Sequence, residues 1–501
     1  MTLESSINDW TKLQLENVDL ENIREAKIIR DAVLDTHQFS QCEINILDLP
    51  MLQRLRRISQ TGLAYLTYPS ATHNRFEHSL GVTILATKFY EALYNRMPEM
   101  IKPGMKEELR LAGLLHDVGH GPFSHSTEQI YKNFPEVIEV KNNKENVASA
   151  HKPHEIISSL IVSSPAFKDF FEQNICSKSY NLQSTPIDLK RVSKMIVGEM
   201  GNTDEAFLSD IINGAFDADK LDYLPRDCYF TGLKMDIDLD RIMHSLSIDK
   251  KNTLGKQGLM IDISGAPFIE QILFNKMMLS TSLYHHHKVR ALECMLKGIF
   301  EACYDFNLKI NGRSFKKVTD FLSVSDIELL TLEGKPDKIK PMIENIRNRD
   351  VLKRAVLISK RTIVFENGDV SSGSAEPYEP NYLDLLINAD NNPAYMKEIR
   401  ETIAQEINGN VTPYDIWIDL PPEPSFKEVS TTVIKTIDDK RAILKEIFRI
   451  DLWIKGYMEN KWKGHIFCPP QYRKQVKLIA PRVLKEEFGI VFNEHATSLP
   501  D

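Results

Sequence analysis

The segment from Leu111 to His125 has the residue types of a metal site. It reads Leu-Ala-Gly-Leu-Leu-His116-Asp117-Val-Gly-His120-Gly-Pro-Phe-Ser-His. Adjacent His116 and Asp117 can offer one imidazole nitrogen and one carboxylate oxygen to the same cation, a donor set that suits borderline or hard divalent ions. No cysteine lies in this segment to favour a softer metal.

A buried helix face is the alternative interpretation of this segment. Leu109, Gly113, His116 and His120 follow helical spacing, as two histidines on a core face would. Three histidines and an aspartate packed around glycines favour the metal site, because so many desolvated polar groups need partners.

A second histidine is predicted to point inward from a helix that begins near Asn74, a suitable N-cap. Helical spacing places His78 on the same face as Val82 and Leu85. Arg75 lies almost one turn earlier on that side. A cation beside an inward-pointing histidine would destabilise an apolar core, but it is suited to binding a phosphate that is held by a metal.

Two further polar motifs follow. The run Asp219-Lys220-Leu-Asp-Tyr223 places two aspartates and a tyrosine at i, i+3 and i+4. Surface salt bridges would explain its charges, but not the interleaved leucine and tyrosine. His154 and Glu155 stand at the start of a predicted helix, where they form either an ordinary terminal charge arrangement or a catalytic pair.

Taken in order, these motifs resemble those of the HD-domain deoxynucleoside triphosphate triphosphohydrolases. The resemblance rests on Gln53-Arg-Leu-Arg56, His73-Asn-Arg-Phe-Glu-His78-Ser-Leu-Gly-Val, His116-Asp-x-Gly-His120-Gly-Pro-Phe-Ser-His125, His154-Glu155 and Asp219-Lys-x-Asp-Tyr223. It covers about residues 27–289. The pattern is closest to the sterile-alpha-motif and HD-domain members, although no sterile-alpha-motif domain is expected here. A single His-Asp pair is weak evidence, whereas this ordered set is specific.

The resemblance implies a metal-dependent enzyme that hydrolyses deoxynucleoside triphosphates to deoxynucleoside and inorganic triphosphate. A divalent ion (Mg, Mn, Fe or Zn) would acidify a water and polarise the α-phosphorus. The implied metal ligands are His78, His116, Asp117 and Asp219. The implied catalytic residues are His120, His125, His154 and Glu155, with Glu155 orienting His154. The implied substrate contacts are Gln60, Arg75, Lys220, Tyr223, Asp227, Lys276 and His285.

The segment that would select the sugar departs from the family pattern. Residues 283–288 read Leu-Tyr-His-His-His-Lys, which puts His285 where the family has a tyrosine. Thr61 stands where the family has a leucine. Both changes are toward polarity, so discrimination against ribonucleotides is left open. The family's upstream phosphate-binding arginine falls at Met277, with Lys276 as a substitute.

The resemblance also implies homo-oligomers, dimers or tetramers, regulated by an activating nucleotide between subunits. The matching positions are Lys27, Asp48, Gln53, Arg56, Arg241 and Lys288. Arg30 stands where the pattern has an asparagine. An internal ion-pair network of Asp48, Arg56 and Arg241 is an equal alternative.

The elements that must position these residues are mainly helices. We expect a mainly α fold: an N-terminal lead-in over residues 1–26, an HD phosphohydrolase core over 27–300, and a smaller mixed α/β region over 301–501 that supports the core and oligomer contacts. In that last region, a β-branched run before Asn367-Gly368 predicts a hairpin turn.

Composition and charge favour a cytoplasmic protein without a membrane partner, and they make nucleic-acid binding the less favoured alternative. The net charge is -8, so nucleic-acid binding would need a local basic patch. The basic stretches 435–449 and 473–485 are expected to be solvated faces. The 6 cysteines are scattered, as in a reduced compartment. The polar N-terminus is unlike a signal peptide, and no apolar run is long enough for a bilayer.

Three alternative functions remain at this stage. Another HD-type nucleotide phosphohydrolase would keep the metal but not the triphosphate cations, and Arg75, Lys220 and Tyr223 count against it. A ribonucleoside triphosphatase would fit His285 and Thr61. A non-catalytic nucleotide sensor or single-stranded nucleic-acid binder would have lost metal ligands, and none is missing.

Overall fold

The computed structural model describes residues 2–18, 25–143, 151–176, 187–201, 203–251, 253–364, 385–386, 388–389, 392–407, 409–422 and 426–498. The chain divides into two compact units. Unit 1 comprises Met1–Leu279, Arg313–Leu329 and Phe426–Asp451, and unit 2 comprises Ser280–Gly312, Leu330–Ser425 and Leu452–Asp501. The predicted hairpin turn at Asn367-Gly368 lies outside the described residues.

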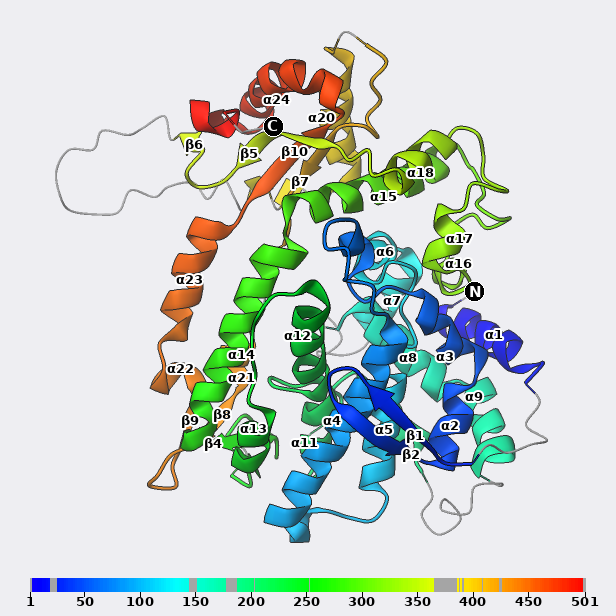
Figure 1. Cartoon of the computed structure of the whole chain (residues 1–501), viewed down its shortest axis with the longest axis vertical. Helices are drawn as coiled ribbons and strands as arrows, with labels where there is room; N and C mark the ends of the chain where they lie inside the picture. Colours follow the sequence, from blue (N-terminus) through cyan, green and yellow to red (C-terminus); the bar gives the residue numbers. More distant parts are fainter. Residues whose placement is uncertain are drawn as a thin grey trace, which may run out of the picture. The chain divides into compact units, whose positions relative to one another are not determined.

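Unit 1 is built mostly of helices (Figure 1). Its N-terminal helices are α1 (Leu3–Leu15), α2 (Gln41–Leu47), α3 (Pro50–Gln53), α4 (Arg75–Arg96), α5 (Met105–Leu115), α6 (His125–Tyr131), α7 (Pro135–Asn143), α8 (Pro153–Ser163) and α9 (Pro165–Phe170). Its later helices are α10 (Leu189–Ile196), α11 (Phe207–Asn213), α12 (Ala218–Thr231), α13 (Leu239–Ser245), α14 (Ala266–Leu279), α16 (Val318–Leu322), α17 (Asp326–Leu330), α21 (Glu428–Thr431) and α22 (Leu444–Ile447).

Two small sheets complete unit 1. Strands β1 (Lys27–Asp31) and β2 (Asp35–Phe39) form an antiparallel hairpin. The second sheet has the order β3-β4-β8-β9, from β3 (Leu246–Ile248), β4 (Leu259–Asp262), β8 (Val433–Lys435) and β9 (Arg441–Ile443). Because β8 pairs in parallel with β4, a late segment of the chain is part of the same unit as the N-terminal helices.

Local signals explain where the helices of the site begin. Asn74 Oδ1 accepts hydrogen bonds from the backbone of Phe76 and Glu77, which confirms the predicted N-cap of α4. Asp217 caps α12 in the same way, by accepting from Lys220 N. Helix α4 packs beside both α5 and α12 (Figure 1), so side chains from three separate segments can face one another.

Unit 2 has its own core around a three-stranded antiparallel sheet. The strand order is β5-β10-β7, with β5 (Lys353–Ile358), β10 (Gly464–Cys468) and β7 (Trp417–Asp419). The strands β6 (Ile363–Val364) and β11 (Val491–Phe492) form a separate pair. The helices are α15 (His287–Asp305), α18 (Lys340–Arg347), α20 (Pro393–Gln405), α24 (Arg473–Phe488) and most of α23 (Ile450–Lys461).

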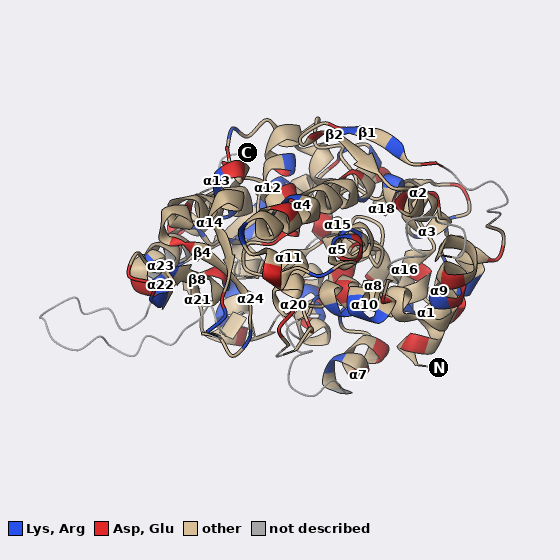
Figure 2. Cartoon of the chain, turned by 90° about the horizontal axis from the view of Figure 1, so that it is seen from below, with Lys and Arg blue, Asp and Glu red and all other residues tan. Residues whose placement is uncertain are grey.

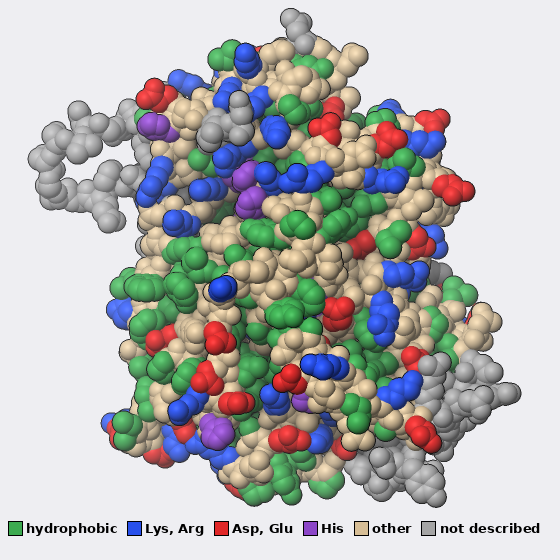
Figure 3. Space-filling model, in the orientation of Figure 1, with side chains coloured by type: hydrophobic (Ala, Val, Ile, Leu, Met, Phe, Trp, Pro, Cys, Tyr) green, Lys and Arg blue, Asp and Glu red, His purple; other side chains and the backbone are tan. Residues whose placement is uncertain are grey.

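These elements confirm the predicted fold class, a mainly helical chain with small sheets in its C-terminal region. The predicted division at residue 300 stays a prediction, because each compact unit takes segments from several parts of the chain. Within the described ranges, none of the helices has the length and apolarity that crossing a bilayer would require. Basic and acidic residues are interspersed along the helices (Figure 2) and share the face drawn in Figure 3.

Candidate metal centre

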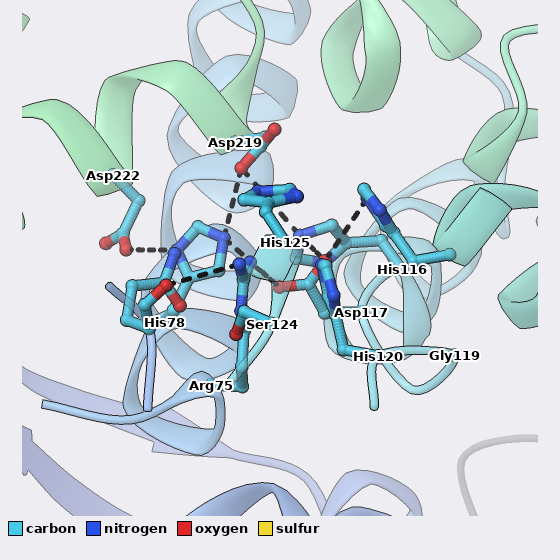
Figure 4. A network of polar contacts seen from close by, with 12 residues as sticks. Arg75, His78, His116, Asp117, Gly119, His120, Ser124, His125, Asp219 and Asp222 are labelled. Atoms are coloured by element: carbon cyan, nitrogen blue, oxygen red, sulfur yellow. Dashed lines mark hydrogen bonds and ion pairs between the residues drawn. The ribbon is translucent and has the colours of Figure 1, made fainter. Parts of the chain in front are cut away.

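The four predicted metal ligands lie close together. His78 comes from α4, His116 and Asp117 follow α5, and Asp219 comes from α12 (Figure 4). His78 Nε2 lies 3.0 Å from Asp219 Oδ1 and 3.6 Å from Asp117 Oδ2. His116 Nε2 lies 3.3 Å from Asp117 Oδ1 and 3.9 Å from Asp219 Oδ1. Three segments that are far apart in the chain therefore bring ligand atoms of His78, His116 and Asp219 together, with the Asp117 carboxylate beside both histidines.

The other nitrogen of each histidine is held by a specific acceptor. His116 Nδ1 lies 2.8 Å from the carbonyl oxygen of Gly113, and His78 Nδ1 lies 2.7 Å from Asp222 Oδ2. An Nδ1–H donor at each position leaves the Nε2 lone pair for a metal. Burial lowers the pKa of His78, but contacts with Asp219 and Asp222 outweigh it and raise this pKa to about 9. A divalent ion would therefore displace a proton when it binds.

The donor set fits a divalent ion. Ligand atoms of His78, His116 and Asp219 all lie within 4.8 Å of one another. Both Nε2 atoms are buried without a well-formed hydrogen bond in the described part of the chain, and such orphaned groups need an explanation. Two imidazoles and two carboxylates would hold the ion and leave positions open for water and a phosphate oxygen.

Electrostatics keep Asp117 and His116 in the forms that bind a metal. Burial would raise the pKa of Asp117, but nearby positive charge, above all Arg75, holds this pKa well below its usual range. Arg75 Nη1 lies 2.7 Å from Asp117 Oδ2. Burial lowers the pKa of His116, so its imidazole is neutral near pH 7. A charged carboxylate and a neutral imidazole are the forms that coordinate metals.

A strained loop holds Arg75 in place. Arg75 Nε donates to Ser124 Oγ (2.8 Å), which donates to the carbonyl oxygen of Ser59 (2.6 Å). Phe123 and Ser124 both have positive φ, 54° and 52°, which non-glycine residues adopt at a cost. The carboxylate of Asp326 binds this loop by accepting from the backbone nitrogens of Phe123 (2.6 Å) and Ser59 (2.8 Å).

A second group of polar side chains lies beside the first. It consists of His120, His125, Glu128 and His154. Glu128 Oε1 lies 2.8 Å from His154 Nδ1, and Oε2 lies 2.6 Å from His125 Nδ1. The rings of His120 and His154 stack at 3.9 Å. His120 Nε2 lies 3.4 Å and His154 Nε2 lies 3.9 Å from Asp117 Oδ1, so this group borders the metal ligands.

The partner of His154 differs from the prediction. The Glu155 carboxylate points back to the start of α8, where its Oε2 accepts from Lys152 N at 3.0 Å, and Glu128 contacts His154 instead. A residue adjacent to His154 on a helix points in another direction, whereas Glu128 on α6 faces it. The spacing His125-x-x-Glu128, one helical turn, is the signal that could have identified Glu128.

The predicted phosphate-binding cations surround an acidic side chain. Lys220 Nζ lies 2.7 Å from Asp217 Oδ2 and 4.0 Å from Glu428 Oε1. Lys276 Nζ lies 2.6 Å from the same Glu428 oxygen. Tyr223 follows Lys220 on α12, and burial raises the pKa of its phenol well above the ordinary value. Sequence reasoning missed Glu428, which lies far along the chain in α21.

The residues predicted to read the sugar are also buried. Asp227 Oδ1 lies 2.7 Å from His73 Nε2. Gln60 Oε1 and Thr61 Oγ1 are buried without a hydrogen-bond partner among the described residues. Orphaned polar atoms of this kind need an explanation, and a bound hydroxyl group would supply one.

His285 and Lys288 belong to unit 2, whereas the four metal ligands belong to unit 1. Burial lowers the pKa of His285 to about 4, so its imidazole is neutral near pH 7. The roles of His285 in sugar selection and of Lys288 in regulation stay predictions.

The other predicted regulatory residues lie in unit 1: Lys27, Asp48, Gln53, Arg56 and Arg241. Arg56 Nε donates to Gln53 Oε1 at 3.0 Å, and its guanidinium lies 3.6 Å from the ring centre of Phe76. Lys27, Arg56 and Arg241 are exposed. Exposed cations are available to an anionic ligand, and the regulatory site stays a prediction.

Comparison with protein families places two models on the chain. The HD domain model matches residues 75–224, which contain the four candidate ligands. A model of the HD associated region matches residues 237–378. A solved structure of a hypothetical protein from Aquifex aeolicus has the same fold, with a TM-score of 0.61 and 22% identity over 91% of this chain and 100% of that chain.

Several curated proteins are similar in sequence. An uncharacterized protein of Methanocaldococcus jannaschii is 28% identical over 90% of this chain and 81% of its own length. A SAMHD1 homolog of Dictyostelium discoideum, a deoxynucleoside triphosphate triphosphohydrolase, is 27% identical over 67% of this chain. SAMHD1 of Homo sapiens is 28% identical over 61% of this chain. The chain spans 61% and 49% of the length of these last two relatives.

Proposed function

We propose that this chain, which belongs to the HD-domain family of metal-dependent phosphohydrolases, hydrolyses deoxynucleoside triphosphates to deoxynucleoside and inorganic triphosphate. The observation that carries the proposal is that His78, His116 and Asp219 offer ligand atoms within 4.8 Å of one another, with the Asp117 carboxylate beside both histidines. The names of the similar SAMHD1 proteins support the substrate class.

Each part of the site has a task in this reaction. His78, His116, Asp117 and Asp219 would hold a divalent ion, which when bound acidifies a water and polarises a phosphate oxygen. Arg75 is buried beside these ligands and supplies positive charge to the α-phosphate. Lys220 and Lys276 would bind the outer phosphates after release from Glu428.

The histidine group supplies the proton. Hydrolysis breaks the bond between the α-phosphorus and the 5′-oxygen, and that oxygen must be protonated as it leaves. Glu128 holds His125 and His154 through their Nδ1 atoms, which leaves each Nε2 free to exchange a proton with the reacting groups. We assign the role of proton donor to His125, whose side chain is 52% exposed, and His154 is the alternative.

The polar atoms of Gln60 and Thr61, unpaired among the described residues, favour a second candidate function, hydrolysis of ribonucleoside triphosphates. Thr61 Oγ1 and Gln60 Oε1 are buried without hydrogen-bond partners in the described part of the chain. A polar pocket rejects an added hydroxyl group only weakly. A ribose 2′-hydroxyl could therefore be accepted here, and activity on ribonucleotides would support this candidate.

One assay tests both functions. The purified protein is incubated with each of the eight common nucleoside triphosphates and Mg²⁺ or Mn²⁺, and the products are separated. Release of inorganic triphosphate and nucleoside supports the proposal, whereas orthophosphate or a nucleoside monophosphate rejects the proposed bond cleavage. Asp219→Ala should abolish metal binding and turnover together. Asp9→Ala removes an exposed carboxylate of α1 and should have no effect.

The resemblance to the HD-domain family also implies regulation by a nucleotide and assembly into oligomers. We propose a homo-oligomer, dimer or tetramer, activated by a nucleotide that binds Lys27, Asp48, Gln53, Arg56, Arg241 and Lys288. Activity assays with a second nucleotide, together with light scattering, test this. A rate and a mass that never respond to the second nucleotide would contradict it.

A further inference from the structure

A continuous chain of buried ion pairs links the β1–β2 hairpin to metal ligand His78. Asp31, the last residue of β1, lies 3.0 Å from Arg226 Nη1 through its Oδ2. Arg226 Nε and Nη2 donate to the two oxygens of Asp222, each at 2.8 Å. Asp222 Oδ2 in turn contacts His78 Nδ1 at 2.7 Å (Figure 4). The chain joins residues of β1, α12 and α4.

The members of this chain are removed from water. Asp222, Arg226 and His78 have 0% exposure and Asp31 has 7%. An isolated buried charge is costly, so each member depends on the others for compensation. Removal of the charge on one of these residues should therefore change the contacts of the other three.

Helix α4 is shaped to admit the ion pair. A Cβ atom on Gly81, one turn after His78, would lie 1.9 Å from Asp222 Oδ1 and 2.4 Å from Arg226 Nη2. Any larger residue would collide with both groups. The glycine thus allows a carboxylate and a guanidinium to lie directly behind the metal-facing imidazole.

Asp31 also determines the shape of the hairpin turn. Its Oδ1 accepts from the backbone nitrogens of Val33 (2.8 Å) and Leu34 (2.9 Å) and from Arg226 Nη2 (3.1 Å). One carboxylate therefore holds both the turn between β1 and β2 and the guanidinium that supports Asp222. The conformation of the hairpin and the position of the guanidinium are coupled through this side chain.

We propose that Asp31, acting through Arg226 and Asp222, is a positioning residue for His78 and makes the β1–β2 hairpin a determinant of metal affinity. A carboxylate on the second nitrogen of a metal-binding histidine fixes its tautomer and raises its basicity. Asp222 makes this contact with His78 directly. Asp31 holds the guanidinium of Arg226 in the position from which it donates to Asp222. The inference rests on the proposed role of His78 as a metal ligand.

The test is the affinity for Mn²⁺, measured by calorimetry, of the full chain and of Asp31→Asn. The asparagine oxygen can still accept from Val33 and Leu34, so the turn is kept while the charge is removed. We expect Mn²⁺ affinity to fall about 10-fold to 100-fold, the range for loss of such a supporting contact. Excess Mn²⁺ should restore turnover, and the number of Mn²⁺ ions bound per chain at saturation should equal that of the unmodified chain, whereas a fraction of chains that cannot fold would lower this number.

Asp35→Asn is the matched control. Asp35 is the exposed residue paired with Asp31 across the same hairpin, and its positive φ of 66° is one that asparagine also adopts. The control removes the same charge from the same hairpin and should bind Mn²⁺ like the unmodified chain. Equal affinities for Asp31→Asn and Asp35→Asn would overturn the inference.

Arg226→Lys is a second variant, for the case that Asp31→Asn does not fold. Lysine keeps the positive charge but lacks the planar fork that spans Asp222 and Asp31, so we expect an intermediate loss of Mn²⁺ affinity. Unchanged affinity in this variant would also overturn the inference. Absence of Mn²⁺ binding by the unmodified chain is a different outcome, because it would reject the proposed metal site itself.

Discussion

Glu128 Oε1 lies 2.8 Å from Nδ1 of His154, and this contact fixes which nitrogen of the imidazole faces the metal ligands. Burial would raise the pKa of Glu128, but His154 and His125 hold this pKa well below its usual range. A carboxylate that stays charged can stabilise the imidazolium that forms when His154 or His125 accepts a proton. Glu128 therefore completes the proposed proton-transfer group, of which the sequence indicated only the histidines.

Replacing Glu128 should impair catalysis without loss of the metal. Glu128→Gln removes the negative charge, so we expect kcat to fall about 100-fold or more, in the range for general acid–base groups. Metal content, measured by mass spectrometry, should not change. Glu155→Gln is the matched control, because Glu155 contacts Lys152 N at the start of α8, and its kcat should stay within a few-fold. A larger loss in Glu155→Gln would favour the adjacent pair that the sequence predicted.

Removing the metal should lower stability as well as activity. An ion that binds only the folded chain stabilises it by about 2.7 kcal/mol at a free concentration 100 times its Kd. We expect a chelator to lower the Tm and added Mn²⁺ to restore it. Asp219→Ala should show no response of the Tm to either treatment. An Mn²⁺-induced rise in the Tm of Asp219→Ala would place the binding site elsewhere.

Glu428 should compete with the substrate for two lysines. Its Oε1 lies 2.6 Å from Lys276 Nζ and 4.0 Å from Lys220 Nζ, the groups proposed to bind the triphosphate. Glu428→Gln removes a negative charge from this position, so we expect KM to fall about 10-fold, or about 1.4 kcal/mol, at similar kcat. Steady-state kinetics measure both constants.

A surface pair provides the control for this prediction. Glu99 lies 2.7 Å from Lys250 Nζ and is exposed, so Glu99→Gln makes the same charge change at a solvated pair. Its KM should not change, because exposed ion pairs contribute little. A KM that is unchanged or higher in Glu428→Gln would show that Lys220 and Lys276 do not bind the phosphates.

Asp326 should make stability depend on pH. Burial raises the pKa of Asp326 to about 6, from an ordinary value of 3.8, against hydrogen bonds from Ser59 and Phe123 that lower it. The folded chain therefore holds this proton more tightly than the unfolded chain does. The resulting stabilisation is present below about pH 4 and is lost as pH rises through 6.

The difference between the chain and Asp326→Asn isolates this effect. We expect the free energy of unfolding of the unmodified chain, relative to Asp326→Asn, to fall by about 2 kcal/mol between pH 4 and pH 7. Urea unfolding at several pH values measures it. A difference that does not change with pH would mean that the carboxylate titrates normally in the folded chain.

The sequence alone was sufficient for the helices that carry the proposed ligands and for the inward direction of His78. Asn74 marked the start of α4, and the helical period then placed His78 on its inner face. Adjacent His116 and Asp117 and the spacing within Asp219–Tyr223 were visible in the same way. Such features are local, because a cap or a helical face depends on residues within a few positions of one another.

Only the tertiary structure decided which carboxylate serves which cation or imidazole. Glu128 rather than Glu155 contacts His154, Arg226 joins Asp222 to Asp31, and Glu428 reaches Lys276 from helix α21. These pairs form between separate elements, and the direction of each side chain depends on how the elements pack. Local periodicity specifies the face of a helix, but the partner on that face comes from a distant part of the chain.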